Sequence, residues 1–275
     1  MKTLHGFIIL YDADCPLCRV YTNDFVQTGM LDMEGRQSYQ EMPATCAVHV
    51  NQQKAVNEIA LVNPVTGEVY YGIESLLKIL GHAWPVFRPL FSCGFFIGVM
   101  KILYRLISYN RRVFLPVAVG TESEAAQPGF HRGYRAAFLV FSWLLVSMIL
   151  HWYGAGMEPV LTIGEWYREP LICGGQLLFQ GLVVGAIAPR KIWDYLGNLM
   201  VVSMLGAIAL LFSGLILKAA TAGAIWYAGA FLLTVGAMLL EHARRCKLLE
   251  MGIGYSISWV LYRILLVGIL INGWL

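Results

Sequence analysis

Two cysteines, three positions apart, carry the most specific chemical signal in the chain. They belong to the segment Asp-Ala-Asp-Cys-Pro-Leu-Cys at residues 12–18, which directly follows the apolar run 7–11. A C-x-x-C pair at a strand-to-helix junction places the first sulfur at the helix N-terminus, where the helix dipole and free N–H groups favour a thiolate. Cys18 then lies one turn further on, within disulfide reach. The spacing predicts thiol–disulfide exchange in which Cys15 attacks and Cys18 resolves the mixed disulfide, with no cofactor beyond the dithiol.

Two carboxylates, Asp12 and Asp14, flank this pair. A nearby carboxylate opposes thiolate formation and offsets the helix dipole. If Asp12 is buried at the end of the preceding strand, it can accept the proton of Cys18 during resolution, and we therefore take Asp12 as the third candidate catalytic residue, one that tunes a thiol pKa. The simpler alternative is that Asp12 or Asp14 merely caps the helix.

Cys46 and His49 form a C-x-x-H pair that offers a different interpretation. Together with Cys15 and Cys18 it supplies three sulfurs and one nitrogen, which is an acceptable tetrahedral zinc set. The 27 residues between the two pairs exceed the spacing of about 15–20 in zinc ribbons. A zinc site is thus an alternative to the redox interpretation, and so is a reduced cysteine pair in a non-catalytic adaptor domain.

The composition of the chain is that of a membrane protein. Of its 275 residues, 58% are hydrophobic and 13% are charged, against about 25% charged residues in soluble domains. The mean hydropathy is +0.62. These values exclude a disordered protein, and six cysteines in a chain of this length exclude a secreted disulfide scaffold. The net charge of +3 is too small to indicate a nucleic-acid partner.

Five segments of low charge are long enough to cross a bilayer, which takes about 20 residues of helix. They are 136–153, 171–188, 197–217, 222–240 and 253–272. Seven basic residues flank these segments on one side and two on the other. The positive-inside rule therefore predicts a protein of the cytoplasmic (inner) membrane with its N-terminal half in the cytoplasm and its C-terminus outside. In that reducing compartment a close cysteine pair is more often catalytic or metal-binding than structural.

The N-terminal half predicts a small α/β layer. The apolar run 7–11 is typical of a buried strand. A helix should start at Pro16 and stop at Gly29. Residues 59–62 and 68–71 form the arms of a predicted hairpin. A short helix over 73–80 should end at Gly81.

Three parts follow from these patterns. We expect a domain over residues 1–120, a linker over 121–133 that is polar and holds Pro and Gly, and an all-α transmembrane helical domain over 134–275. Residues 84–115 show helical spacing of apolar side chains with basic residues between them. This helix either closes the first domain or lies along the inner leaflet.

The stretch Tyr-Asp-Ala-Asp-Cys-Pro-Leu-Cys at 11–18 resembles the DCC family of thiol-disulfide oxidoreductases, whose signature is D-x-x-C-x-x-C after a strand. Segments 59–62 and 69–72, the helix after them, and the aromatic and basic tail to about Pro116 are also similar to that family. The resemblance implies a thioredoxin-like fold, a redox-active Cys15/Cys18 pair, and a protein or small-molecule disulfide or thiol as substrate. One departure concerns the cis-proline that faces the C-x-x-C in thioredoxins, because residues 55–58 hold no proline.

Arg263 lies near the middle of the fifth predicted span, where a charged side chain costs about 2.5–3.5 kcal/mol on insertion scales. No Asp or Glu lies inside the five segments, so neutral groups, water or a bound anion must face it. Gln176 and Gln180 are spaced i, i+4 and share one face of the second span. They are candidate partners, as is a lipid or quinone headgroup. The sequence predicts either a hydrogen-bonding hub of the bundle or an intramembrane polar site.

Overall fold

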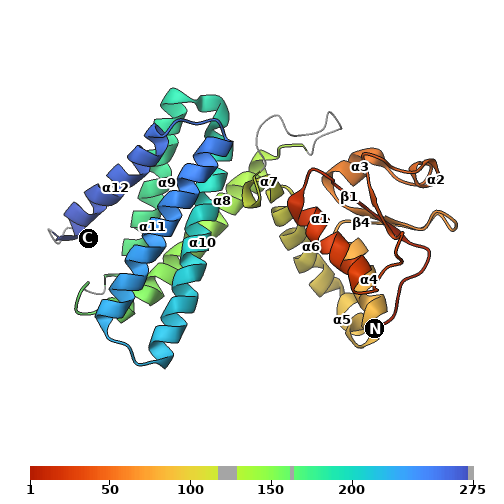
Figure 1. Ribbon diagram of the computed structural model, residues 1–275, viewed down its shortest axis with the longest axis horizontal. Helices are drawn as coiled ribbons and strands as arrows, with labels where there is room; N and C mark the ends of the chain where they lie inside the picture. The colour runs from red at the N-terminus through yellow and green to blue at the C-terminus, as the bar shows by residue number, and fades with distance from the viewer. Residues whose placement is uncertain (117–128, 162–163, 272–275) are drawn as a thin grey trace. The chain divides into compact units, whose positions relative to one another are not determined.

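The computed structural model describes residues 1–116, 129–161 and 164–271, which form two compact units (Figure 1). The first unit consists of Met1–Leu115 together with the segment that ends at Tyr134, and the second begins at Arg135. Residues 117–128, which make up most of the predicted linker, lie outside the described part of the chain. The boundaries of the linker therefore stay a prediction.

The first unit is built on one mixed sheet with the strand order β2-β1-β3-β4. The strands are β1 (Ile8–Tyr11), β2 (Arg36–Ser38), β3 (Ala60–Val62) and β4 (Val69–Tyr71). Strand β1 pairs in parallel with β2 and antiparallel with β3, and β3 pairs antiparallel with β4. This arrangement confirms the predicted thioredoxin-like fold. Strand β2 was not predicted, because its three residues show no alternation of their own.

Helices cover both faces of this sheet, which explains why the sequence of β1 is a continuous apolar run. Successive side chains of a strand point to opposite faces, so that Ile9 packs into one core and Leu10 into the other. Helices α1 (Pro16–Gln27), α4 (Ile73–Ala83) and α6 (Gly94–Ser108) contribute to the core around Ile9. Helices α2 (Ala44–Ala47) and α3 (Gln52–Asn57) contribute to the core around Leu10. The remaining short helices of the unit are η1 (Pro85–Phe87), α5 (Arg88–Phe91) and α7 (Arg111–Phe114).

Helix α4 continues past Gly81, where the sequence predicted its end. Gly81 is buried, and a Cβ at this position would lie 3.3 Å from the ring of Phe91. The glycine therefore allows α5 to approach α4 closely, and the helix ends at Ala83 instead.

Helix α6 closes the first unit, in agreement with one of the two interpretations of residues 84–115. The Tyr104 hydroxyl accepts a hydrogen bond from the Ile59 N–H at 3.1 Å, and the Ser108 hydroxyl donates to the Asn57 carbonyl at 2.8 Å. Its other side is apolar and open, with Phe95 83% and Ile102 69% exposed. The segments Pro85–Phe91 and Gly94–Ser108 are together apolar enough for a span, but the chain bends by 86° between them. Contact of this open face with the inner leaflet stays a prediction.

The second unit contains five long helices among the residues described. They are α8 (Arg132–Gly154), α9 (Arg168–Ile187), α10 (Ile192–Ala219), α11 (Ala224–Leu248) and α12 (Gly254–Ile271), with the short turns η2 (Ala155–Met157) and η3 (Pro189–Lys191). Helices α8 to α11 are long and apolar enough to cross a membrane, and α12 is apolar but shorter over its described residues. Four of the five predicted spans are thus confirmed, and the fifth, 253–272, coincides with the shorter apolar helix α12.

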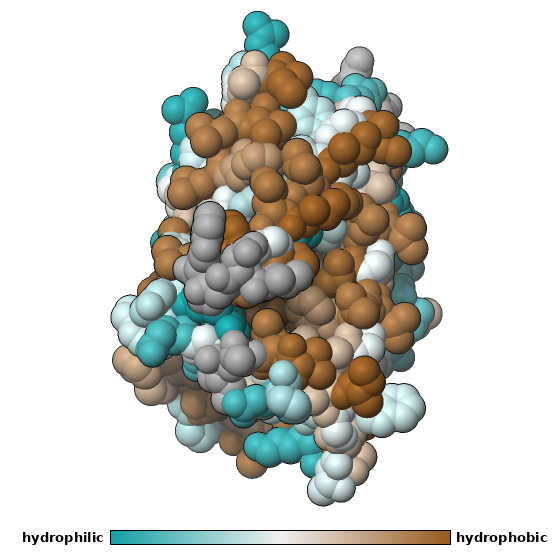
Figure 2. Space-filling model, turned by 90° about the vertical axis from the view of Figure 1, so that its left-hand side faces the viewer, coloured by the Kyte–Doolittle hydropathy of each residue, from teal (hydrophilic) through white to brown (hydrophobic). Residues whose placement is uncertain are grey.

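The outer surface of this bundle is hydrophobic. Figure 2 shows a face on which apolar side chains predominate. On α9, Leu178 is 70% and Leu182 75% exposed, and on α12 Ile264 is 63% exposed. Soluble proteins rarely expose contiguous apolar surface on this scale, whereas lipid-facing helices must. The second unit is therefore a membrane-spanning helical bundle.

Candidate active site

The junction between β1 and α1 holds the two cysteines of the C-x-x-C pair. Helix α1 begins as predicted, with Cys15 as an extended N-cap residue and Pro16 in its first turn. The Cys15 sulfur accepts a hydrogen bond from the backbone N–H of Cys18 at 3.3 Å. Both cysteines are free thiols and buried, with 6% and 3% of their surface exposed. The cap places the Cys15 sulfur at the positive end of the helix.

The two thiols differ in their affinity for a proton. The pKa of Cys15 is lowered to about 7, chiefly because the Cys18 thiol donates a hydrogen bond to its sulfur. Burial opposes this shift, and the charge of Arg111 supports it. The pKa of Cys18 is raised, because its thiol is the donor in that hydrogen bond and because it is buried. At neutral pH the first sulfur is therefore the better nucleophile, while the second keeps its proton.

A buried arginine completes the site, although the sequence analysis did not assign it there. Arg111 lies 99 residues after Asp12 in the chain, and its Nη2 donates to Oδ2 of Asp12 at 2.6 Å. The same nitrogen donates to the Val56 carbonyl at 3.2 Å, in the segment before β3 where a proline was looked for. The Asp12 and Arg111 side chains are each 5% exposed. The arginine charge lowers the pKa of both Cys15 and Cys18.

Asp12 is buried at the end of β1, which was the condition for its predicted role. Its Oδ1 accepts hydrogen bonds from the backbone N–H of Asp14 and from Nε2 of Gln40, both at 3.0 Å. Its Oδ2 faces Arg111. Because the sulfur of Cys15 caps α1, the interpretation of Asp12 as a helix cap is wrong. Within the described chain none of the Asp12 hydrogen bonds goes to Cys18, so the geometry favours an anchor for Arg111 over a proton acceptor.

A tyrosine on the next turn of α1 borders the resolving thiol. The Tyr21 hydroxyl acts to lower the pKa of Cys18, and burial raises the pKa of Tyr21. Tyr21 stands at i+3 from Cys18, and positions three apart share a helix face. The sequence thus contained a signal for this neighbour, whereas no local pattern points to Arg111.

A comparison with known families agrees with this geometry. The family model for DCC1-like thiol-disulfide oxidoreductases matches residues 9–115. Over these residues the chain is similar to the DCC1-like thiol-disulfide oxidoreductase family. The match confirms the resemblance seen in the sequence and includes Asp12, Cys15, Cys18 and Arg111. No curated protein and no solved structure shows a significant match to the chain.

The alternative zinc set is not assembled in the DCC1-like unit. Cys46 is fully buried in the core around Leu10. The ring of His49 lies against Gly67, in the turn between β3 and β4. Across the described ranges no three His, Cys, Asp or Glu side chains are placed to hold a metal ion. Cys46 is therefore a core residue, and it does not converge with Cys15 and Cys18.

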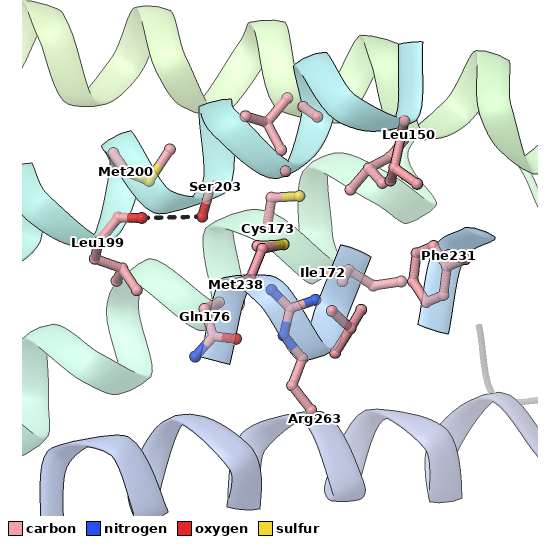
Figure 3. A pocket seen from close by; sticks show the side chains of 15 residues that line it. Leu150, Ile172, Cys173, Gln176, Leu199, Met200, Ser203, Phe231, Met238 and Arg263 are labelled. Atoms are coloured by element: carbon pink, nitrogen blue, oxygen red, sulfur yellow. Dashed lines mark hydrogen bonds between the residues drawn. The ribbon is translucent and has the colours of Figure 1, made fainter. Parts of the chain in front are cut away.

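The polar residues predicted inside the membrane lie in the bundle, but they do not form one group. Oε1 of Gln180 accepts hydrogen bonds from the hydroxyls of Tyr195 at 2.7 Å and Ser258 at 3.1 Å. Gln176 and Arg263 instead line one cavity between the helices (Figure 3). The predicted pair Gln176 and Gln180 is thus divided between two environments.

One histidine of the bundle is deeply buried. The His242 side chain of α11 is 1% exposed. Its Nε2 lies 3.1 Å from the Tyr195 hydroxyl, and its Nδ1 lies 3.1 Å from the Ser256 hydroxyl. Neighbouring helices supply these partners, which the position of His242 near the end of a span does not reveal.

Proposed function

We propose that this protein is a membrane-anchored thiol–disulfide oxidoreductase whose Cys15 and Cys18 work on the cytoplasmic face. The family of residues 9–115 implies thiol or disulfide substrates, and the apolar helices imply a bilayer around the second unit. The observation that carries the proposal is the arrangement of the two sulfurs. Cys15 lies at the N-terminus of α1 with a lowered pKa of about 7, beside a Cys18 thiol that keeps its proton.

The reaction follows from that difference. The Cys15 thiolate attacks one sulfur of a protein or small-molecule disulfide, the substrate S–S bond breaks, and one half of the substrate leaves as a thiolate. Cys18 then loses its proton and attacks the Cys15 sulfur, which releases the other half. The substrate gains two electrons, and Cys15 and Cys18 are left as a disulfide that a thiol reductant must reduce again. In this proposal no cofactor beyond the dithiol takes part.

Arg111 and Asp12 are positioning residues in this scheme. The positive charge of Arg111 favours the thiolate at either sulfur, first on Cys15 and then on Cys18 when it resolves the mixed disulfide. Asp12 holds Arg111 by the 2.6 Å ion pair, and its own charge raises the pKa of Cys15. The carboxylate thus limits the effect of the arginine while it fixes the position of the guanidinium.

The cytoplasmic placement rests on the distribution of basic residues at the bundle ends. The Lys191 ammonium donates to the Leu249 carbonyl at 2.7 Å, so the turn after α9 and the end of α11 lie side by side. The basic residues at these two ends are Arg190, Lys191, Arg244, Arg245 and Lys247. Concentration of positive charge at one end supports a cytoplasmic location for that end. With five spans, the C-terminus is then outside.

A redox titration tests the proposal directly. The full chain, purified in detergent, is equilibrated across a ladder of glutathione ratios, and its thiols are counted by mass-shifting alkylation after denaturation. We expect a reversible two-electron transition of Cys15 and Cys18 at about −200 to −300 mV. The exposed Cys93 is the internal control and should be alkylated at every potential. Alkylation of Cys15 and Cys18 at every potential would support an adaptor instead, and alkylation only after a chelator is added would support a metal site.

A further inference from the structure

The helical bundle encloses a cavity of about 40 Å³ that the proposed thiol chemistry does not use. Its walls are mostly apolar, with Val146, Leu199 and Phe231 among the lining residues. Gln176 of α9 and Arg263 of α12 reach it from different helices (Figure 3), while the Ser203 hydroxyl in the same lining donates to the Leu199 carbonyl at 3.1 Å. The cavity therefore combines an apolar enclosure with a cation and an amide.

Gln176 is a buried amide with no partner. It is 5% exposed, and neither its side-chain nitrogen nor its oxygen makes a hydrogen bond in the described structure. Buried polar side chains almost always have a partner in the protein or in a bound species. Gln180, one turn further along α9, differs from it because its Oε1 accepts hydrogen bonds from Tyr195 and Ser258, although its Nε2 also has no partner among the described residues.

Arg263 is a half-buried cation without an anion among the described residues. Its Nε is buried and unpartnered, and its guanidinium stacks over the Trp259 ring at 4.8 Å. Across the described ranges no carboxylate lies within ion-pair distance of Arg263. The acidic residue of α9, Glu169, pairs with Arg168 at 2.7 Å instead. A cation–π contact compensates only part of the desolvation of a buried guanidinium, so the remaining charge requires a partner from outside the chain.

We propose that this cavity binds a monovalent anion of halide size, which accepts hydrogen bonds from the Gln176 amide and the Arg263 guanidinium. The negative charge of the ligand follows from the positive charge of Arg263, which no carboxylate of the described chain balances. The size follows from the volume, since about 40 Å³ holds about three waters or one halide ion, whereas a cavity that takes a benzene ring measures about 150 Å³. A quinone ring is therefore too large for this space.

The anion would connect two helices that already pack together. The Tyr262 hydroxyl of α12 donates to the Ile172 carbonyl of α9 at 2.8 Å. An anion held by Gln176 of α9 and Arg263 of α12 adds a second polar link between them. Because such a ligand binds the folded bundle and not the unfolded chain, it must raise thermal stability in proportion to the logarithm of its concentration.

The experiment compares halide with a bulky anion. The full chain in detergent is melted with tryptophan fluorescence as the readout, in sodium chloride and in sodium gluconate at one ionic strength. We expect chloride to raise the melting temperature by about 3–6 °C at tenfold excess over its dissociation constant. Crystals soaked in bromide should show an anomalous peak between the Gln176 amide and the Arg263 guanidinium.

Two variants locate the effect. Gln176→Leu removes the amide at similar volume and should weaken the halide response at least tenfold. Thr234→Val is the matched control on α11, because the Thr234 hydroxyl donates to Ala230 of its own helix at 2.8 Å, and it should keep the full response. Equal melting temperatures in chloride and gluconate, with water alone in the cavity, would overturn the proposal. A lipid or quinone that copurifies at one equivalent and occupies the cavity would overturn it as well.

Discussion

Two arginines whose Nε atoms are buried, one in each unit, show two ways of holding a positive charge inside the protein. Arg111 of the DCC1-like unit lies 2.6 Å from Asp12 and donates to the Val56 carbonyl. Arg263 of the bundle lies over the Trp259 ring, and no carboxylate of the described chain pairs with it. The charge of Arg111 is thus balanced within the chain, whereas that of Arg263 depends on a partner from outside.

This difference explains what each arginine can do. Since Asp12 neutralises much of the Arg111 charge, the arginine is not the main reason why the pKa of Cys15 is about 7; the hydrogen bond from Cys18 is. Arg111 further lowers the pKa of a thiol that the local helix geometry already favours as a thiolate. Arg263 has no such neighbour, and its uncompensated charge makes it suited to bind a ligand.

The largest effect is expected when Cys15, whose thiolate the charge of Arg111 stabilises, is replaced. Cys15→Ser should lower the rate of exchange with an aromatic disulfide by more than about a thousandfold, because the nucleophile is lost. Cys18→Ser should still attack but accumulate the mixed disulfide, visible as a mass adduct on Cys15. Cys93→Ser is the control and should leave the rate unchanged. Residual exchange in Cys15→Ser at the wild-type rate would show that the charge of Arg111 serves no thiol chemistry.

The next largest effect is expected when the balanced ion pair is broken. Arg111→Met should lower the free energy of unfolding by about 3–5 kcal/mol, since it leaves Asp12 buried without its partner. The measurement is urea unfolding of the full chain in detergent, followed by fluorescence.

A double variant separates stability from chemistry. Asp12→Asn combined with Arg111→Met removes both charges and should recover most of the lost stability. The pKa of Cys15 is read from the pH dependence of its alkylation. It should be higher in the double variant than in the single variant Asp12→Asn. If Arg111→Met left this pKa unchanged in both backgrounds, Arg111 would have only a structural role.

The pH dependence of alkylation tests the lowered pKa of Cys15 in the first unit. Alkylation of Cys15 by iodoacetamide should show a midpoint at about pH 7, and Cys18→Ala should move the midpoint upward because the main hydrogen bond is lost. A lowered pKa in the folded state stabilises the reduced protein above the ordinary thiol pKa of 9.0, and this contribution disappears as the pH falls through 7. The free energy of unfolding attributable to Cys15 should therefore rise between pH 7 and 9. A wild-type midpoint near pH 9 would contradict this.

The smallest effect is expected for the unbalanced arginine. In chloride-free buffer Arg263→Met should change the free energy of unfolding by less than about 1 kcal/mol, because no carboxylate of the chain is left without its partner and an apolar side chain suits the bundle interior. The variant should also lose the stabilisation by chloride that the wild type shows. Thermal melting in both salts measures this. A loss as large as that of Arg111→Met would mean that the two arginines are held in the same way.

Local sequence patterns were sufficient for the elements that carry the two sulfurs and the spans. The apolar run before Asp12 and the cysteine–proline start of α1 depend on hydrogen bonds between residues a few positions apart. For this reason Cys15 as N-cap and Pro16 in the first turn could be predicted and are confirmed. The spans follow from apolar length alone, which the bilayer sets at about 20 residues.

Contacts between distant residues were decided by the tertiary structure alone. Strand β2 exists because Arg36–Ser38 pairs with β1, and Cys46 became a core residue because α2 packs against the sheet. The ion pair of Asp12 with Arg111 joins residues 99 positions apart, and no pattern within a turn or a strand encodes such a pair. The chain by itself determined where the thiolate forms, because a helix N-terminus is a local feature. Only the packing of the elements determined which charges surround that thiolate and which arginine has no carboxylate partner.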